Sequence, residues 1–280
     1  MKMRRGASVA GVVLLAGALS GCGAERAVDR AAESVDEAVD VLAALRKTST
    51  KADQAGSAQV ETTVSMPGAK GIRMDGLWSW GKGTAFDVQM DARQAGMADV
   101  TKSDTVRVLF VDGTYYYKVD PTLVGGPAGK HWLSVDASVV MGRDGTDMAK
   151  QSNPVAGLRF IGTSRHAQEV GLETVLGRET THYTATISKD DLGRAGTVLA
   201  PNDKNALMNS FTGGNVTSIT IDVWVDGRDL PVRIKQKIGQ ASVSVTFKSF
   251  DKAKQVTAPT AADVLDMTET IKQQAAAGQG

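Results

Sequence analysis

The chain has 280 residues, a length that allows one large domain or two small ones. It carries 32 Lys and Arg against 31 Asp and Glu, and no basic stripe with interleaved aromatic residues occurs, so we expect no nucleic-acid partner. Its single cysteine excludes an internal disulfide, so the stability of the fold must come from its core.

The first 22 residues have the pattern of a bacterial lipoprotein signal. A basic start, residues 2–5, precedes an apolar run, residues 7–19, which is too short to span a bilayer as a stable helix. Leu19-Ser20-Gly21-Cys22 then matches a lipobox, in which the cysteine sulfur is acylated and the preceding peptide removed. An ordinary secretory signal that ends at a chance cysteine is the alternative interpretation.

Cleavage between Gly21 and Cys22 would divide the chain into a signal peptide, residues 1–21, and a single mature domain, residues 22–280. A bacterial lipoprotein carries a diacylglycerol on this sulfur, and two chains hold a protein on a membrane durably. We therefore predict lipidation at Cys22 and a mature protein anchored on the outer face of the cell membrane.

A helix and a long series of strands are predicted from the hydrophobic periodicity. Residues 25–47 repeat small apolar side chains at steps of three and four, which predicts a helix directly after the cysteine. Beyond Gly56 the period is two, which predicts strands. The strands are expected at residues 59–66, 72–80, 84–92, 105–111, 115–119, 131–135, 164–173, 179–188, 219–226, 230–238 and 241–250.

Turns and interruptions divide this series. Asp112-Gly113 is a type I′ turn signal, because both central residues of that turn need positive φ. Alternation fails in residues 136–161 and 189–211, where we expect irregular segments with short helices. Thr260, with Asp263 three residues later, predicts the start of a final helix over residues 260–274.

One face of nearly every predicted strand is apolar and the other polar, so the sheet has a dry side and a wet side. A sheet of this size must curl, and only the helices can cover its dry side. The predicted fold class is α+β, with a curved antiparallel half-barrel of about ten or eleven strands wrapped around helices.

The sequence also resembles a known family over residues 28–271. It is similar to the LppX/LprA/LprF/LprG group of actinobacterial cell-envelope lipoproteins, relatives in fold of the lipoprotein carrier LolA. The resemblance implies a half-barrel around an apolar cavity that binds acylated lipids or lipoglycans and carries them across the envelope. Its matching pieces lie at residues 74–76, 111–116 with Trp132, 175–180, 223–226, 230–233 and 259–263.

Inward-facing positions on the strands are the candidates for a lipid cavity. They are Phe86, Met90, Val108, Phe110, Ile221, Val223, Ile234 and Val245. Methionine is flexible and polarizable, which suits an adaptable cavity mouth, and the candidates in the irregular segments are Met141, Met148 and Met208. The alternative is that the same strand faces form an ordinary filled core.

No enzyme signature occurs in the sequence. His131, His166 and His182 lie in separate segments without metal-ligand spacing, so we predict no metal and no cofactor. Gly81-Lys82-Gly83 reads as a hairpin turn, not a phosphate loop. Trp78 and Trp80 share a strand face and could stack on sugars, although packing in the sheet is the simpler interpretation.

The sequence therefore predicts a membrane-anchored extracytoplasmic lipoprotein, not an enzyme. It would bind an acylated lipid or glycolipid in an apolar cavity and carry it within the cell envelope, with an envelope transporter as a possible protein partner. The alternative is a structural or sensory lipoprotein that does not transport and binds a protein partner.

Overall fold

The computed structural model describes residues 24–68, 70–81, 83–123, 129–141, 153–193, 195, 199–212, 216–250 and 255–277. The chain forms two compact units, residues 1–37 and 38–280. In the first, the described backbone from residue 24 onward is helical. The predicted cleavage and lipidation residues, Gly21 and Cys22, lie outside the described part, so both stay predictions.

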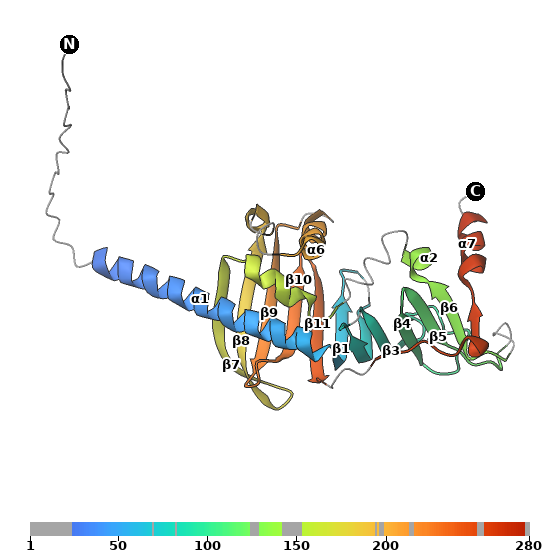
Figure 1. The fold of residues 1–280 in the computed structure, drawn as a ribbon. Coiled ribbons are helices and arrows are strands. Elements are labelled where there is room, and N and C mark those ends of the chain that lie inside the picture. Colours follow the sequence, from blue (N-terminus) through green and yellow to red (C-terminus); the bar gives the residue numbers. More distant parts are fainter. Residues whose placement is uncertain are drawn as a thin grey trace, which may run out of the picture. The chain divides into compact units, whose positions relative to one another are not determined.

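The second unit is built on one large sheet (Figure 1). The strand order is β12-β6-β5-β4-β3-β2-β1-β11-β10-β9-β8-β7, so β1 joins an N-terminal meander to a C-terminal one. The strands are β1 (Ser57–Ser65), β2 (Ile72–Ser79), β3 (Ala85–Asp91), β4 (Thr105–Val111), β5 (Thr114–Lys118), β6 (Trp132–Asp136), β7 (His166–Val175), β8 (Arg178–Ser188), β9 (Ser218–Asp226), β10 (Pro231–Ile238), β11 (Ala241–Ser249) and β12 (Val264–Asp266).

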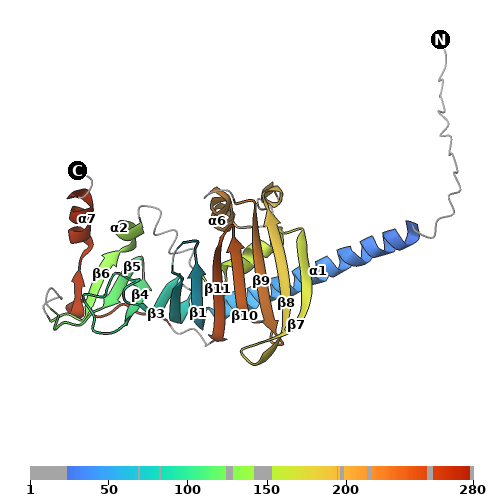
Figure 2. The same cartoon turned by 180° about the vertical axis from the view of Figure 1, so that it is seen from behind.

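Helical segments accompany the sheet. They are α1 (Ala24–Ala55), α2 (Ala137–Met141), α4 (Ala156–Phe160), α6 (Pro201–Thr212) and α7 (Thr268–Ala277), with 3-10 turns η1 (Ile161–Thr163), η2 (Lys189–Asp191) and η3 (Ala261–Asp263). Val41 and Leu45 of α1, Leu158 of α4 and Leu207 of α6 join the apolar face of the sheet in one buried cluster. We call this face the covered face and the opposite one the outer face, which is in front in Figure 2.

The predicted α+β class with a large curved, unclosed sheet is confirmed, with two corrections. The sheet has 12 strands, not ten or eleven. It is also not wholly antiparallel, because β12 pairs with β6 in parallel, with Val264 opposite Trp132.

The predicted final helix over residues 260–274 is wrong in its first half. Asp263 does not cap a helix: its carboxylate accepts a hydrogen bond from the His131 backbone N–H at 3.0 Å and contacts the His131 ring at 2.7 Å. Met267 N–H then donates to Ser134 O at 2.9 Å. These contacts hold the chain extended along β6, so the helix α7 begins only at Thr268.

One predicted turn is confirmed, and the predicted end of the leading helix is wrong. Asp112 and Gly113 have φ of 51° and 83°, which confirms the predicted turn between β4 and β5. The leading helix runs to Ala55 instead of stopping near residue 47. Its last turns contain Ala52 and Thr48, both fully buried, and the Thr48 hydroxyl donates to Ala44 O at 3.1 Å, so burial there needs no large apolar side chain.

Gly76 in β2 supplies a test of the tight packing between β2 and β3. A Cβ at this position would lie 2.1 Å from Asp87 O and 2.8 Å from Val88 Cα, both backbone atoms that cannot move aside cheaply. We expect Gly76→Ala to lower the free energy of unfolding by about 1–3 kcal/mol in urea titrations. The control is Gly227→Ala, where a Cβ meets open space, with an expected change within about 0.5 kcal/mol.

Candidate functional site

The eight predicted cavity positions all lie on the covered face. Strand pairing aligns Phe86 with Phe110, and Ile234 with Val245 and Val223, so these side chains point to the same side. Seven of the eight are buried in the cluster and Met90 is packed against it. The structure therefore brings them together as neighbours in one core, and their contact with a lipid stays a prediction.

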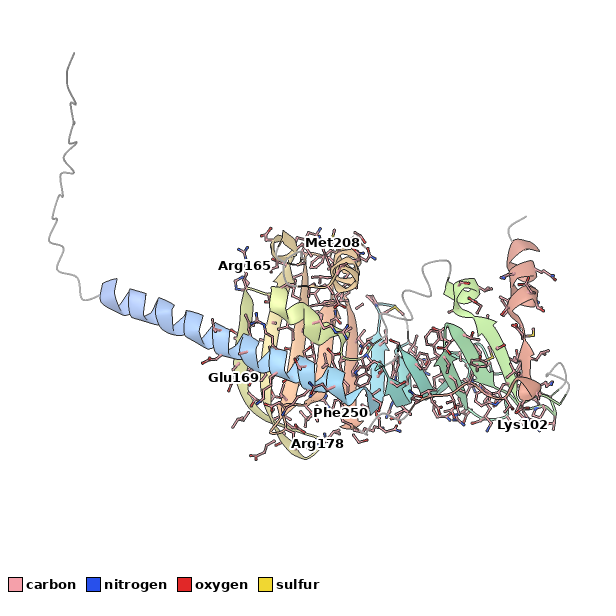
Figure 3. All side chains as sticks on the ribbon, in the orientation of Figure 1. Lys102, Arg165, Glu169, Arg178, Met208 and Phe250 are labelled. Atoms are coloured by element: carbon pink, nitrogen blue, oxygen red, sulfur yellow. The ribbon has the colours of Figure 1, made fainter. Side chains whose placement is uncertain are left out.

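The predicted mouth methionines are not brought together by the described structure. Met208 lies on α6 with 42% of its surface exposed (Figure 3). Met141 ends α2, but its side chain lies outside the described part, as does the whole of Met148. A role for these three residues at a cavity mouth stays a prediction.

A pocket of about 340 Å³ lies between α1 and the α4–η1 segment. Its buried wall is apolar, and its exposed side carries Arg46 and Thr50 of α1. The lining residues are Leu42, Leu45, Arg46, Ser49, Thr50, Leu158, Arg159, Ile161 and Gly162. Leu45, Leu158 and Ile161 also belong to the cluster on the covered face, so the pocket adjoins that core.

The sequence did not single out this pocket. Leu42 and Leu45 belong to the apolar stripe of the predicted helix, but nothing in the sequence marked Arg46, Ser49 or Thr50 as their neighbours in a pocket. Leu42 and Leu158 lie more than a hundred positions apart in the chain, and no local pattern joins them.

Arg159 holds the pocket wall through ion pairs. Its guanidinium lies 2.8 Å from Asp53 of α1 and 3.3 Å from Asp203 of α6, so it links α4 to two other helices. The hydrogen bond to Asp53 and the two negative charges raise the pKa of Arg159 despite its partial burial. In contrast, Arg46, which lines the exposed side of the pocket, makes no ion pair with any residue that the structure describes.

A second tie fixes α1 to the β9–β10 turn. Lys51 Nζ lies 2.6 Å and Lys47 Nζ 3.0 Å from the Asp229 carboxylate, and Lys51 also donates to Arg228 O at 2.9 Å. The hydrogen bonds from Lys51 and then Lys47 lower the pKa of Asp229 below its ordinary value. The C-terminal half of α1, which lines the pocket, is therefore tied both to α4 and to the β9–β10 turn.

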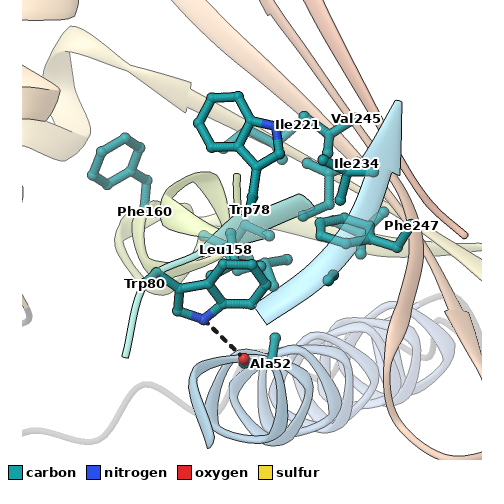
Figure 4. Close-up of a cluster of buried hydrophobic side chains, with 14 of the residues drawn as sticks. Ala52, Trp78, Trp80, Leu158, Phe160, Ile221, Ile234, Val245 and Phe247 are labelled. Atoms are coloured by element: carbon teal, nitrogen blue, oxygen red, sulfur yellow. Dashed lines mark hydrogen bonds between the residues drawn. The ribbon is translucent and has the colours of Figure 1, made fainter. Parts of the chain in front are cut away.

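Trp78 and Trp80 differ in the way their indoles are bonded. Trp80 Nε1 donates to Ala52 O of α1 at 3.1 Å, the dashed line in Figure 4. Trp78 stacks at a tilt on Phe86, with ring centroids 4.6 Å apart, but its Nε1 is buried and has no hydrogen-bond partner among the residues that the structure describes. Both side chains are less than a tenth exposed, which favours the packing interpretation over stacking on sugars.

A polar cluster occupies the outer face at β7–β9. The His182 ring stacks on Trp224 with centroids 4.2 Å apart and lies between Glu173, at 2.9 Å, and Asp222, at 3.3 Å. Hydrogen bonds lower the pKa of Glu173 below its ordinary value. The bond with the Trp224 indole has the larger effect and the bond with His182 the smaller one. Within the described residues, no group of three or more His, Cys, Asp or Glu side chains is arranged to hold a metal ion.

The chain has relatives among Streptomyces proteins. An uncharacterized 31.2 kDa protein from Streptomyces griseus is 26% identical over 246 residues, which cover 83% of this chain and 81% of that protein. A Streptomyces coelicolor protein, whose name assigns it provisionally to the lipoproteins, is 22% identical over 82% of this chain and 76% of its own length. No protein-family model matches the chain.

Among solved structures, the chain is similar to LprF from Mycobacterium bovis. The likeness covers 79% of this chain and 96% of LprF, at 15% identity and a TM-score of 0.49. LprF is one of the proteins that name the group which the sequence resembles. None of the helices in the described ranges is long and apolar enough to cross a membrane.

The two indoles give a test of hydrogen bonding in the core. Trp→Phe leaves a small void at either position, but only at residue 80 does it also remove a hydrogen bond and leave the Ala52 carbonyl without its indole donor. We expect Trp80→Phe to lower the free energy of unfolding by about 1–3 kcal/mol more than Trp78→Phe does. Urea denaturation followed by circular dichroism measures both, and equal losses would contradict the assignment.

The ion pairs of Asp229 with Lys47 and Lys51 predict how the melting temperature depends on pH. Because the pKa of this carboxyl is lowered in the folded state, its stabilising contribution is present above the ordinary value of 3.8 and is lost as the pH falls below it. We expect Asp229→Asn to lower the melting temperature at neutral pH and to flatten its fall in acid.

The substitution is sterically mild, since Asp229 has a φ of 61° and asparagine tolerates that conformation. The matched control is Asp112→Asn, which changes an exposed aspartate that also has positive φ, 51°, and makes no ion pair with any described residue. If the melting temperatures of Asp229→Asn and of the wild type fall in parallel as the pH is lowered, the ion pairs of Asp229 do not contribute to stability.

Proposed function

We propose that the chain is a membrane-anchored extracytoplasmic lipoprotein that binds an acylated lipid or glycolipid and carries it within the cell envelope. The observation that carries the proposal is the pocket beside α1, with an apolar wall toward the core and the exposed Arg46 on its open side. The lipobox at residues 19–22 and the lipoprotein relative support the same conclusion.

The energetics of transfer define what such a site needs. A lipid that leaves a bilayer must keep its tails out of water, and each methylene is worth about 0.8 kcal/mol, or on the order of 25 kcal/mol for two long tails. A binding surface must therefore be dry, extensive and free of unpaired charge. Asp191 is the one charged side chain among the buried described residues, and it accepts hydrogen bonds from the Ser188 backbone and hydroxyl.

The pocket is large enough for only a part of an amphiphile. Its volume of about 340 Å³ lies near the lower end of the 300–1,000 Å³ that small-molecule sites occupy. Leu42, Leu45 and Ile161 suit an acyl chain, and the Arg46 guanidinium and Ser49 hydroxyl suit the polar head beside it. Further chain length would have to lie along the covered face, where the eight predicted lining residues pack.

A second candidate function is binding of a protein partner without transport. The observation in its favour is the edge strand β7, which ends the sheet and exposes Val170 and Leu172 at 52% and 79%. An edge strand with free backbone groups and exposed apolar side chains is a template for pairing with another chain. Two results together would favour this function: a stable protein partner recovered in pull-downs from membranes, and a purified chain that carries no lipid.

Native mass spectrometry of the full chain purified from membranes tests the lipid proposal. We expect the protein to carry a lipid adduct. We expect Leu42→Trp to weaken the affinity for lipid about tenfold, which corresponds to about 1.4 kcal/mol, because the indole fills the pocket that Leu42 lines. The control is Val39→Trp on the same helix, where 59% of the side chain is exposed. Protein that is consistently empty and takes up no lipid would refute the proposal.

A further inference from the structure

The indole of Trp78 is an unmet hydrogen-bond donor inside an otherwise apolar core. Its side chain is 4% exposed, and Nε1 has no hydrogen-bond partner within the described part of the chain. On β2 it lies between Ala58 of β1 and Phe86 of β3, whose side chains contain no acceptor. A buried donor without a partner costs free energy that a phenylalanine at this position would not incur.

The neighbouring tryptophan shows that this fold can satisfy an indole. Trp80 lies two residues further along the same side of the chain and donates to Ala52 O. Figure 4 shows the nitrogen of Trp80 turned toward α1 and that of Trp78 turned away from it, toward the sheet side chains around Ile221. Thr62 Oγ1, on the same face of β1 and 6% exposed, is a second buried polar atom without a partner.

We propose that Trp78 Nε1–H is the interior polar contact for the ligand and donates a hydrogen bond to the carbonyl oxygen of an ester- or amide-linked acyl chain. The inference rests on the proposed lipid-binding function and specifies its ligand class. Acyl lipids are bound in preference to ether-linked lipids and hydrocarbons of the same length, which offer no carbonyl.

The surroundings of Trp78 select this chemistry. A carboxylate or phosphate here would be a buried charge facing a single neutral donor, which cannot replace its hydration. A free hydroxyl group would bring a donor of its own beside the indole, where the side chains of the cross-strand neighbours Ala58 and Phe86 offer no acceptor. An ester carbonyl only accepts, so it satisfies the indole and adds no new unmet group.

The pocket beside α1 adjoins the buried cluster that contains Trp78. Leu45, Leu158 and Ile161 line the pocket and belong to the same buried cluster as Trp78. An acyl chain that enters the pocket therefore contacts side chains of the cluster that surrounds the indole. The headgroup stays on the side of Arg46 and Thr50, which are exposed.

The test compares two lipids that differ only in the carbonyl. Dipalmitoyl phosphatidylcholine and its ether-linked dihexadecyl counterpart have the same headgroup and chain length, and their binding to the full chain is compared by competition in native mass spectrometry. We expect the wild type to prefer the ester lipid about 2–10-fold, the contribution of one hydrogen bond. Trp78→Phe abolishes the preference, whereas Trp80→Phe, which removes the satisfied indole, retains it.

The outcomes separate this inference from the proposed function. A wild type that binds both lipids equally, or a Trp78→Phe protein that keeps the preference, overturns the carbonyl contact while lipid binding stands. A wild type that binds neither lipid overturns both.

A second measurement requires no variant to fold. The indole ¹H–¹⁵N resonance of Trp78 in the wild type is expected to move downfield on addition of the ester lipid and to stay in place with the ether lipid. A resonance that stays unchanged while the ester lipid is bound overturns the contact. A buried water that already occupies the indole N–H would give this result.

Discussion

A sheet with one apolar face and one polar face cannot exist alone in water, and this constraint organises the whole structure. The covered face carries buried apolar side chains on strands from β8 to β5. Twelve strands are too many for a short helix to shield. The second half of α1, together with α4 and α6, lies against this face and supplies Leu45, Leu158 and Leu207 to its core. Every other feature depends on how these helices are held there.

The last turns of α1 are held by three contacts, one hydrogen bond and two ion pairs. The Trp80 indole bonds its backbone at Ala52 from inside the core, Lys51 bonds Asp229 at the sheet rim, and Asp53 pairs with Arg159 of α4. All three contacts involve residues just beyond the part of the helix that lines the pocket. The pocket wall formed by α1 is therefore anchored at its C-terminal side, while α4 is a short helix whose N-cap, Val155, makes no side-chain capping bond.

Several buried polar side chains of this fold are satisfied by hydrogen bonds within the chain. The buried hydroxyl of Thr48 bonds within its own helix, and Thr163 and Ser164 bond backbone carbonyls at 2.7 Å. Among the described residues, Trp78 Nε1 and Thr62 Oγ1 depart from this pattern, because both are buried without a partner. Trp78 belongs to the same buried cluster as three residues that line the pocket, Leu45, Leu158 and Ile161.

The sequence by itself determined whatever depends on neighbours in the chain. Period-two alternation marked the strands and the face they bury, and Asp112-Gly113 marked its turn, because side-chain direction and φ are local properties. Only the tertiary structure decided the continuation of α1 to Ala55, the replacement of the start of the last helix by a strand beside β6, and the pocket. Each of these is made by groups distant in sequence, such as Ala52 with Trp80 or Leu42 with Leu158. Their contact energies exist only once the sheet has brought them together.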